Sequence, residues 1–315
     1  SIYFLEDFMI NQYQKKYKEE TLEKTHAPVN KPKMYKIKIP LGKNFADVNK
    51  LMREQGLHTV CEEARCPNKS ECWSHRTATF LILGDICTRS CGFCNIKTGK
   101  PKGLDLDEPR RVAEAVYNLH LKHVVITSVD RDDLEDGGAS IYSETIKLIR
   151  EKLPNCTIEI LIPDFKGDEK AFEIIMKNPP DILNHNLETV NRMYPVVRPQ
   201  AKYQRSLNLL KWFKDKGLIT KSGIMVGIGE SKEEIFELMK DLRDVNCDIM
   251  TIGQYLQPSK EHLQVHRYVE IEEFKEYEIY GKELGFKDVF SGPFVRSSYH
   301  AERHAELVSV NTKNN

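Results

Sequence analysis

Six of the eight cysteines in this chain lie between residues 61 and 94, and their spacing divides them into two groups. The first triplet has the spacing C-x4-C-x5-C and consists of Cys61, Cys66 and Cys72. The second triplet has the spacing C-x3-C-x2-C and consists of Cys87, Cys91 and Cys94. Thiols this close in sequence form disulfides, bind zinc or hold iron–sulfur clusters. The two triplets therefore mark where the chain could carry out chemistry.

An iron–sulfur cluster suits the second triplet better than zinc or a disulfide does. The chain is long enough to bury its own core, and we expect no secretory signal, so disulfides are disfavoured. Structural zinc takes four Cys or His ligands, whereas each triplet supplies three, with His58 and His75 as nearby candidates for the fourth. Three cysteines would leave one cluster iron open for chemistry. For the first triplet, zinc and iron–sulfur both stay open.

The second triplet follows an apolar strand-like run and has Phe93 just before its last cysteine, and in this it resembles the signature of the radical SAM superfamily. That resemblance implies a [4Fe–4S] cluster that binds S-adenosylmethionine (SAM) and cleaves it to a 5′-deoxyadenosyl radical. The two triplets together with VRSSYHA at residues 295–301 resemble the lipoyl synthase family. Other stretches agree from about residue 33 to residue 303, among them GLHTVCEEARCPN, TATFLILGDICTRSC and IGQYLQPS.

The lipoyl synthase resemblance implies catalytic and metal-binding roles for both triplets and for one serine. The second triplet would hold the cluster that cleaves SAM. The first triplet would hold an auxiliary [4Fe–4S] cluster that donates sulfur and is consumed. In the family, a serine of the RSSY motif is the fourth ligand of the auxiliary cluster, and we assign this role to Ser298, with Arg296 orienting the tail. An alkoxide is a harder ligand than thiolate, so it would let its iron leave more readily.

The resemblance also implies a reaction and its partners. Sulfur would be inserted at C6 and C8 of an octanoyl chain on a lysine of a lipoyl carrier domain, with two SAM molecules used per turnover. Such domains occur in the E2 subunits of 2-oxoacid dehydrogenases and in the H protein of glycine cleavage. A low-potential electron donor, such as flavodoxin or ferredoxin, and cluster-assembly or carrier proteins are implied as well.

Two other functions fit parts of the pattern. Another radical SAM sulfur enzyme, such as a biotin synthase or a methylthiotransferase, would share C-x3-C-x2-C but lack the first triplet paired with RSSY. A non-enzymatic zinc or iron–sulfur module that recruits partners would not need a barrel with polar residues at its strand ends. Metal analysis separates the second alternative, since about eight irons with sulfide would argue against zinc.

The balance of charge narrows the class of protein. Lys+Arg and Asp+Glu each number 47, so the formal net charge is zero. This argues against a general nucleic-acid or membrane-surface protein. No apolar run approaches the roughly 18 residues of a membrane-spanning helix. Residues 1–20 contain acidic residues and fit neither a signal peptide nor a transit peptide, and the free cysteines favour a reducing compartment, so we expect a cytoplasmic protein.

Alternating apolar and amphipathic segments must position these residues. A helix is expected at residues 44–55, followed after the first triplet by six strands and six helices. The expected strands are residues 80–84, 123–129, 157–163, 181–186, 221–229 and 248–256. The expected helices are residues 109–120, 139–153, 169–177, 203–216, 232–245 and 271–284. Near-continuous apolar strands indicate a parallel sheet, and six units predict an α/β fold with a partial (β/α)6 TIM-type barrel. The radical SAM resemblance implies the same form.

We expect four segments along the chain. They are an N-terminal arm (1–32), an extension with the first triplet (33–78), the partial barrel (79–285) and a C-terminal extension with RSSY (286–315). A short edge strand or an extended arm is expected at residues 35–39.

Residues near the carboxyl ends of the strands, all but one of them polar, are candidate SAM contacts, because active sites of such barrels lie at that end. The candidates are Thr127, Asp130, Asn184, Asn186, Glu188, Arg198 and Met225. Each alone could equally cap a helix or stabilise a loop. His185 is better explained as a buried, hydrogen-bonded histidine than as a ligand, and Cys156 and Cys247 as small buried apolar residues.

Overall fold

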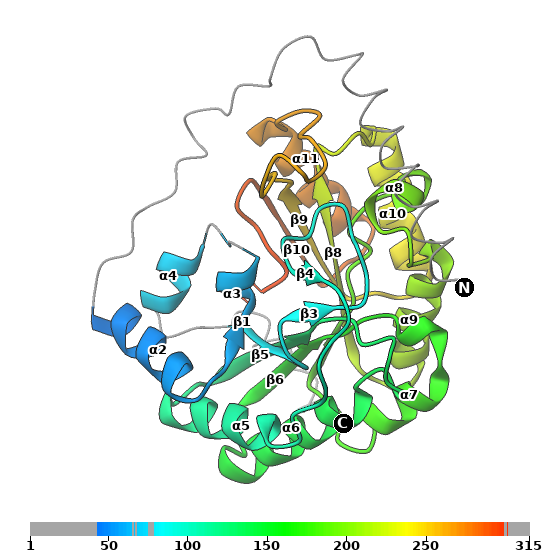
Figure 1. Ribbon diagram of the computed structural model, residues 1–315. Coiled ribbons are helices and arrows are strands. Elements are labelled where there is room, and N and C mark those ends of the chain that lie inside the picture. The colour runs from blue at the N-terminus through cyan, green and yellow to red at the C-terminus, as the bar shows by residue number, and fades with distance from the viewer. Residues whose placement is uncertain (1–42, 65, 67, 75–78, 299–300, 302–315) are drawn as a thin grey trace.

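The computed structural model describes residues 43–64, 66, 68–74, 79–298 and 301. The expected arm at residues 1–32 and edge strand at residues 35–39 lie outside this part of the chain. The described residues form an eight-stranded sheet in the order β1-β2-β5-β6-β7-β8-β9-β10, and a second sheet of β3 and β4. Figure 1 shows the large sheet curving around an inner face, with the long helices on its outside.

Seven strands of the large sheet run parallel. They are β2 (Thr79–Ile82), β5 (His123–Ser128), β6 (Thr157–Leu161), β7 (Ile182–Asn184), β8 (Ile219–Val226), β9 (Ile249–Gln254) and β10 (Asp288–Gly292). β1 (His58–Thr59) adds to the β2 edge in the antiparallel direction. The predicted α/β fold with a partial barrel is confirmed, since β1 and β10 are the two edges of an open sheet. The sequence did not predict β10, which pairs with β9 from Asp288 to Gly292.

Helices follow the strands as predicted. The long ones are α2 (Lys43–Glu54), α5 (Glu108–Asn118), α6 (Ala139–Lys152), α7 (Glu169–Ile175), α9 (Tyr203–Asp215), α10 (Lys232–Asp244) and α11 (Ile271–Glu283). Local signals explain two starts: Pro109 occupies the first turn of α5, and Ser231 and Glu234 form a capping box at α10. Among the described residues, no helix combines the length and apolar character needed to cross a membrane.

The inner face of the curved sheet carries a buried polar network. Lys221 on β8 reaches Glu159 on β6, with its Nζ 2.9 and 3.1 Å from the two carboxylate oxygens. Asn184 on β7 donates to the same carboxylate at 2.9 Å. β6 and β8 are not neighbours, so these contacts cross the inside of the sheet. Lys221, Glu159 and Asn184 are all 0% exposed. The pairing therefore keeps two opposite charges compensated inside the fold.

Replacing Lys221 by methionine is expected to lower the free energy of unfolding by about 3–5 kcal/mol, because it leaves the Glu159 carboxylate buried without its cation. An anaerobic urea titration measures this. The double variant Lys221→Met/Glu159→Gln is expected to recover much of the loss. Lys240→Met is the control, since Lys240 pairs with Glu237 at the surface and should change stability little. If Lys221→Met and Lys240→Met lowered the free energy of unfolding equally, the buried ion pair of Lys221 and Glu159 would not be the stabilising contact.

Candidate functional site

The second triplet lies in a loop just beyond β2, at the carboxyl end of the parallel strands. Cys87 ends β3 (Ile86–Cys87), which pairs with β4 (Lys97–Thr98). The loop is tied to distant segments: the Gly92 amide donates to the Val197 carbonyl at 2.9 Å, and His262 Nε2 donates to the Cys94 carbonyl at 2.8 Å. These bonds fix the loop from two sides, and His262 is a residue that sequence reasoning missed.

The three thiols of the second triplet lie close together, and each of the three cysteines is half-buried. The Cys87 sulfur accepts the amides of Arg89 at 3.4 Å and of Asp130 at 3.3 Å. Burial first, and then the Asp130 carboxylate, raises the pKa of Cys87 to about 12. Burial also raises the pKa of Cys91, where Cys94 and Cys87 add to the effect and Arg198 opposes it. Burial raises the pKa of Cys94 to about 11. Free thiols with amide donors fit a cluster, because bound iron would hold them as thiolates.

Arg89 holds this loop to the strand ends, and the sequence did not reveal it. The guanidinium is 3% exposed and binds Asp132 at 2.8 and 2.9 Å, Asp164 at 2.7 Å and Asp130 at 3.3 Å. The three carboxylates come from the loops after β5 and β6, so one buried cation joins the second triplet to both. The signal available in the sequence was its position between Cys87 and Cys91, which does not show which carboxylates bind it.

Four of the candidate SAM contacts are linked to the second triplet, either directly through a neighbouring thiol or through one another: Asp130, Asn186, Glu188 and Arg198. Arg198 donates from Nη1 to the Asn186 carbonyl at 2.5 Å, and its Nε has no acceptor among the described residues. Burial raises the pKa of Glu188, while Arg198 opposes the shift. Glu188 also has a left-handed backbone with φ of +64°, an uncommon conformation away from glycine. Asp130 and Glu188 both raise the pKa of Cys94, which places these carboxylates near that thiol.

The other candidates are less directly placed. Thr127 donates its hydroxyl to the Leu161 carbonyl at 2.8 Å, and Asn184 belongs to the buried network with Glu159. Met225 is half-buried on β8, and its amide donates to the Glu188 carbonyl at 2.9 Å. His185 is buried and hydrogen-bonded through both ring nitrogens, as expected.

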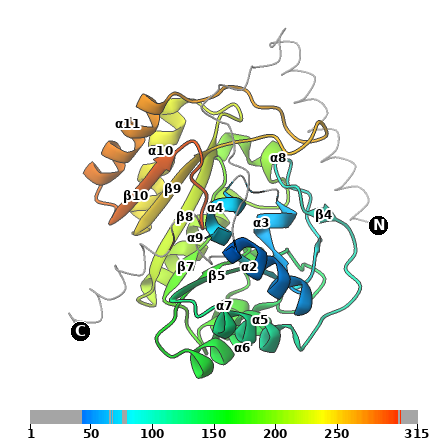
Figure 2. The same cartoon turned by 90° about the vertical axis from the view of Figure 1, so that its left-hand side faces the viewer.

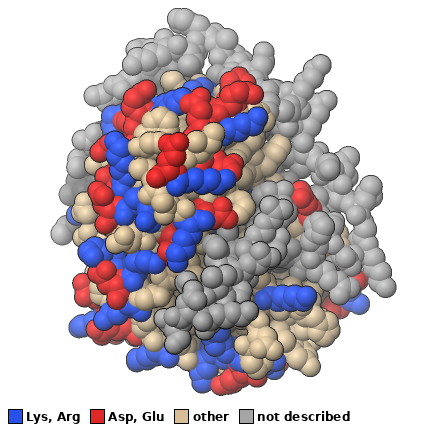
Figure 3. All heavy atoms as spheres, turned by 180° about the vertical axis from the view of Figure 1, so that it is seen from behind, with Lys and Arg blue, Asp and Glu red and all other residues tan. Residues whose placement is uncertain are grey.

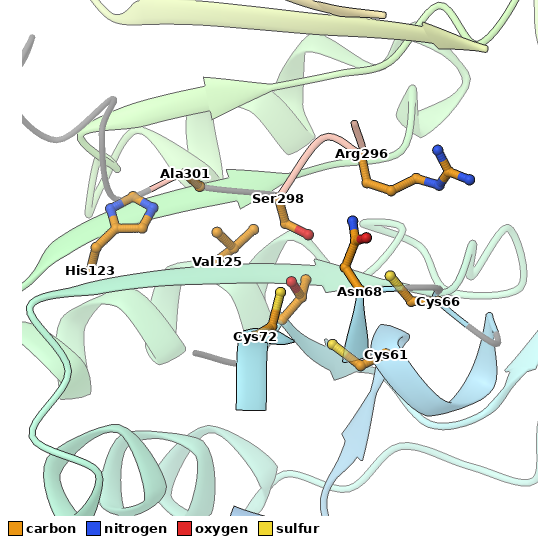
Figure 4. A pocket seen from close by; sticks show the side chains of 10 residues that line it. Cys61, Cys66, Asn68, Cys72, His123, Val125, Arg296, Ser298 and Ala301 are labelled. Atoms are coloured by element: carbon orange, nitrogen blue, oxygen red, sulfur yellow. The ribbon is translucent and has the colours of Figure 1, made fainter. Parts of the chain in front are cut away.

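The first triplet faces a pocket that also receives the C-terminal segment (Figure 4). Cys61 lies on α3 (Val60–Glu63), Cys72 on α4 (Lys69–Ser74) and Cys66 between them. Ser298 lines the same pocket, and its hydroxyl points toward the cysteine side. The remaining lining residues are Asn68, Thr79, His123, Val125, Arg296 and Ala301. Three thiols and one hydroxyl from opposite ends of the chain therefore meet, and this donor set fits a cluster with three cysteine ligands and one oxygen ligand.

The segment at residues 294–298 is held against both the first triplet and the barrel. Asn68 donates to the Phe294 carbonyl at 2.7 Å. Ser297 and Asn186 are hydrogen-bonded, with the closer contact 2.7 Å. A Cβ on Gly253 would lie 2.0 Å from the Val295 carbonyl oxygen, so β9 needs glycine there. Ser297 is thus used by the barrel, whereas Ser298 is directed to the pocket of the first triplet.

Within the described part of the chain, no three His, Cys, Asp or Glu side chains are arranged to bind one metal ion. The fit of the triplets to clusters rests on their donor atoms and surroundings, as given above.

Two family descriptions match the chain. Residues 81–242 match the radical SAM superfamily, and residues 4–66 match the N-terminal domain of lipoyl synthase of the radical SAM family. A lipoyl synthase of Rubrobacter xylanophilus is 55% identical over 278 residues, covering 88% of this chain and 87% of that protein. A mitochondrial lipoyl synthase of Nematostella vectensis is 54% identical over 275 residues, covering 87% and 94%.

Solved structures share the fold at low identity. Methylornithine synthase superposes with a TM-score of 0.53 at 16% identity, covering 80% of this chain and 75% of that one. SuiB of Streptococcus suis, solved with S-adenosylmethionine bound, gives a TM-score of 0.51 at 14% identity, covering 76% and 57%. Both structures agree with the parallel sheet described above. Because their sequence identity to this chain is below 20%, they support the fold and not a function.

Proposed function

Because the chain belongs to the lipoyl synthase family of the radical SAM superfamily, and is therefore an enzyme that inserts sulfur, we propose which residues carry that activity. The second triplet holds a [4Fe–4S] cluster to which SAM binds. The first triplet, with Ser298, holds an auxiliary [4Fe–4S] cluster that donates sulfur. One observation carries this assignment: the three thiols of the first triplet and the hydroxyl of Ser298 line one pocket.

The protein's own residues have three tasks in this proposal. When bound, the cluster of the second triplet would supply one electron to SAM, and the cleavage of SAM would give methionine and a 5′-deoxyadenosyl radical that can remove hydrogen from an unactivated C–H bond. Arg89 fixes the cluster loop to the strand ends by binding the carboxylates of Asp132 and Asp164, whose negative charges it balances. Arg198, with an unused N–H and a buried position, is suited to the SAM carboxylate. The half-buried position of the three cysteines would limit the access of water, which would quench or divert a reactive species.

The residues that contact SAM are proposed from their location around the second triplet. We propose Asp130, Asn186 and Glu188 as polar contacts of SAM, because they lie with Arg198 around the second triplet. Thr127, Asn184 and Met225 support that site from the strands below. Two SAM molecules are used per turnover, one for each sulfur.

The substrate is proposed to be an octanoyl chain on a lysine of a lipoyl carrier domain, with sulfur added at C6 and C8. The carriers are E2 subunits of 2-oxoacid dehydrogenases and the H protein of glycine cleavage. The reaction also needs an electron donor, such as flavodoxin or ferredoxin, and a cluster-carrier protein.

Free thiols and oxygen-sensitive clusters need a reducing compartment, for which we propose the cytoplasm. We keep the division into segments 1–32, 33–78, 79–285 and 286–315 as a proposal.

Anaerobic turnover tests the function. Iron-reconstituted protein is incubated with dithionite, SAM and an octanoyl-lysyl peptide, and the peptide is analysed by mass spectrometry. A gain of two sulfurs, with two 5′-deoxyadenosine per product, is the expected result. Release of 5′-deoxyadenosine without sulfur on the peptide would contradict the substrate assignment. Iron-loaded protein that makes no 5′-deoxyadenosine would contradict the SAM site.

Replacing Ser298 by alanine is expected to lower sulfur insertion about 10- to 100-fold, a typical effect of losing one supporting group at a metal site. Formation of 5′-deoxyadenosine should change much less, because that step uses the second triplet. Ser297→Ala is the comparison variant: because Ser297 is bonded to Asn186, a proposed SAM contact, its loss should leave the iron of the auxiliary cluster unchanged. Mass spectrometry of the peptide and Mössbauer spectra of the iron measure both variants. An unchanged sulfur yield and unchanged spectra in Ser298→Ala would remove Ser298 as a ligand.

A further inference from the structure

The stretch Lys97–Asp107 is an open loop between the second triplet and α5. Ten of its eleven residues are exposed, with only Pro101 half-buried. In Figure 2 the loop runs down the right-hand side of the molecule from β4 to α5. No part of the chemistry described above uses it, although it begins three residues after Cys94.

The start of this loop is in direct backbone contact with a proposed cluster ligand. β4 pairs Thr98 with Cys87, and the Gly99 amide donates to the Cys87 carbonyl at 2.9 Å. The Thr98 hydroxyl donates to the Arg89 carbonyl at 3.0 Å. Electron transfer falls steeply with distance, so a protein that docks on this loop would bring its redox centre near the second triplet by a short route.

The charge of the loop is positive where the rest of the chain is balanced. Three lysines, Lys97, Lys100 and Lys102, are exposed along it, and the side chain of Lys97 is 76% exposed. Lys97 lies 3.8 Å from Asp85, a loose contact. The chain as a whole has zero formal net charge, so this group of lysines is a local feature.

The carboxylates at the end of the loop are compensated by arginines. Asp105 lies 2.8 Å from Arg111, and Asp107 lies 2.7 Å from Arg110. These pairs offset the two negative charges of the loop, so its three lysines leave it with a net positive charge. Such a surface attracts acidic partners and steers them during association.

Two apolar side chains lie in the same loop. Leu106 is 77% exposed and Leu104 is 36% exposed. Isolated exposed leucines need no explanation, but these two follow Lys102 by only two and four residues in the sequence. A small apolar contact surrounded by charge is typical of transient complexes, including those of electron-transfer proteins.

We propose that the loop Lys97–Asp107 is the docking surface for an acidic, low-potential one-electron carrier of the flavodoxin or ferredoxin type. This rests on the proposed function. One electron leaves the carrier, which is oxidised by one electron, and reduces the cluster at the second triplet by one electron. No proton or bond is exchanged between the proteins. The lysines provide long-range attraction and the leucines provide contact.

The test compares two sources of electrons. Lys100→Glu/Lys102→Glu reverses two charges on the loop, and Lys170→Glu/Lys177→Glu makes the same change at exposed positions of α7 and the turn after it. Production of 5′-deoxyadenosine is measured with dithionite and with increasing reduced flavodoxin at low and high salt. We expect the loop variant to raise the KM for flavodoxin about tenfold or more at low salt. The dithionite rate should be unchanged, as should both rates in the control variant.

Three outcomes would contradict the proposal. The KM for flavodoxin could be the same in the loop variant and wild type. The dithionite rate could fall as much as the flavodoxin rate, which indicates a disturbed cluster loop. The KM for an octanoylated carrier domain could rise while that for flavodoxin does not, which assigns the loop to the carrier domain. Leu106→Ser, which leaves the charges intact, should raise the KM for flavodoxin at all salt concentrations. Absence of dithionite-driven activity in the wild type would instead count against the proposed function itself.

Discussion

Replacing Cys91 with alanine is expected to abolish production of 5′-deoxyadenosine, with a loss greater than about 100-fold. Loss of an outer-shell partner at a metal site already lowers activity about 10- to 100-fold, and Cys91 is proposed as a direct ligand. With one of three thiolates gone, the cluster to which SAM would bind is no longer held. Sulfur insertion should disappear together with SAM cleavage, because it depends on the radical.

Cys247→Ala is the control for this variant. Cys247 is a free thiol that is 0% exposed and lies outside both triplets, so its loss tests removal of a buried sulfur without loss of a ligand. Anaerobic assays of 5′-deoxyadenosine and the iron content of each variant are the measurements. About four irons should be missing from Cys91→Ala and none from Cys247→Ala. Normal SAM cleavage by iron-loaded Cys91→Ala would contradict the assignment of the second triplet.

The parallel strands were predictable because each is a nearly continuous apolar run. Strands buried on both faces show this pattern, and the predicted strand at residues 123–129 matches β5 closely. β10 was missed for a physical reason: DVFSG has only two apolar residues and lies at the edge of the sheet. At an edge the hydrogen bonds to β9, rather than a run of buried side chains, define the strand.

The inner face of the barrel was harder to predict than its outer face. Lys221 and Glu159 are charged residues inside apolar strands, and each is acceptable only because the other lies across the sheet. Asn184 was correctly predicted as a strand-end residue, since β7 ends there, but the hydrogen bond of its side chain to Glu159 was not predicted. Period-two alternation shows that such residues share a face, but their partners are set by strand order, which a single sequence does not give.

In the functional site, too, some residues could be predicted from the sequence and others could not. The triplets were visible because ligands close in sequence impose short spacings. Arg89 was not visible, because Asp130, Asp132 and Asp164 belong to segments up to 75 residues away. The choice between Ser297 and Ser298 rested on family resemblance alone, and the contact of Ser297 with Asn186 now supports it. Long-range partners are therefore what the structure adds to the sequence.

The C-terminal segment links the two proposed cluster sites. Its residues contact Asn68 of the first triplet region and Asn186 beside the second triplet. Arg296 lines the pocket of the first triplet, and its charge also opposes the raised pKa of Glu188. A substrate chain that must meet both a radical and a sulfur atom would lie between these sites. The segment is thus in position to fix the relative placement of the two steps.

Replacing Cys66 with alanine is expected to separate those two steps. Sulfur insertion should fall by more than about 100-fold, because a ligand of the proposed sulfur-donating cluster is lost. SAM cleavage should continue within a few-fold of wild type, because the second triplet is held by its own contacts with Arg89, Val197 and His262. The expected product is 5′-deoxyadenosine without sulfur on the octanoyl peptide.

This result differs in kind from that of Cys91→Ala, which should lose both products. Cys156→Ala is the matched control, since Cys156 is buried and free but distant in sequence from both triplets. Mass spectrometry of the peptide and chromatography of the nucleoside, from the same anaerobic reaction, measure both steps. Sulfur on the peptide at the wild-type level in Cys66→Ala would mean that sulfur comes from another source. Loss of both products would mean that the first triplet is needed to fold the site rather than to donate sulfur.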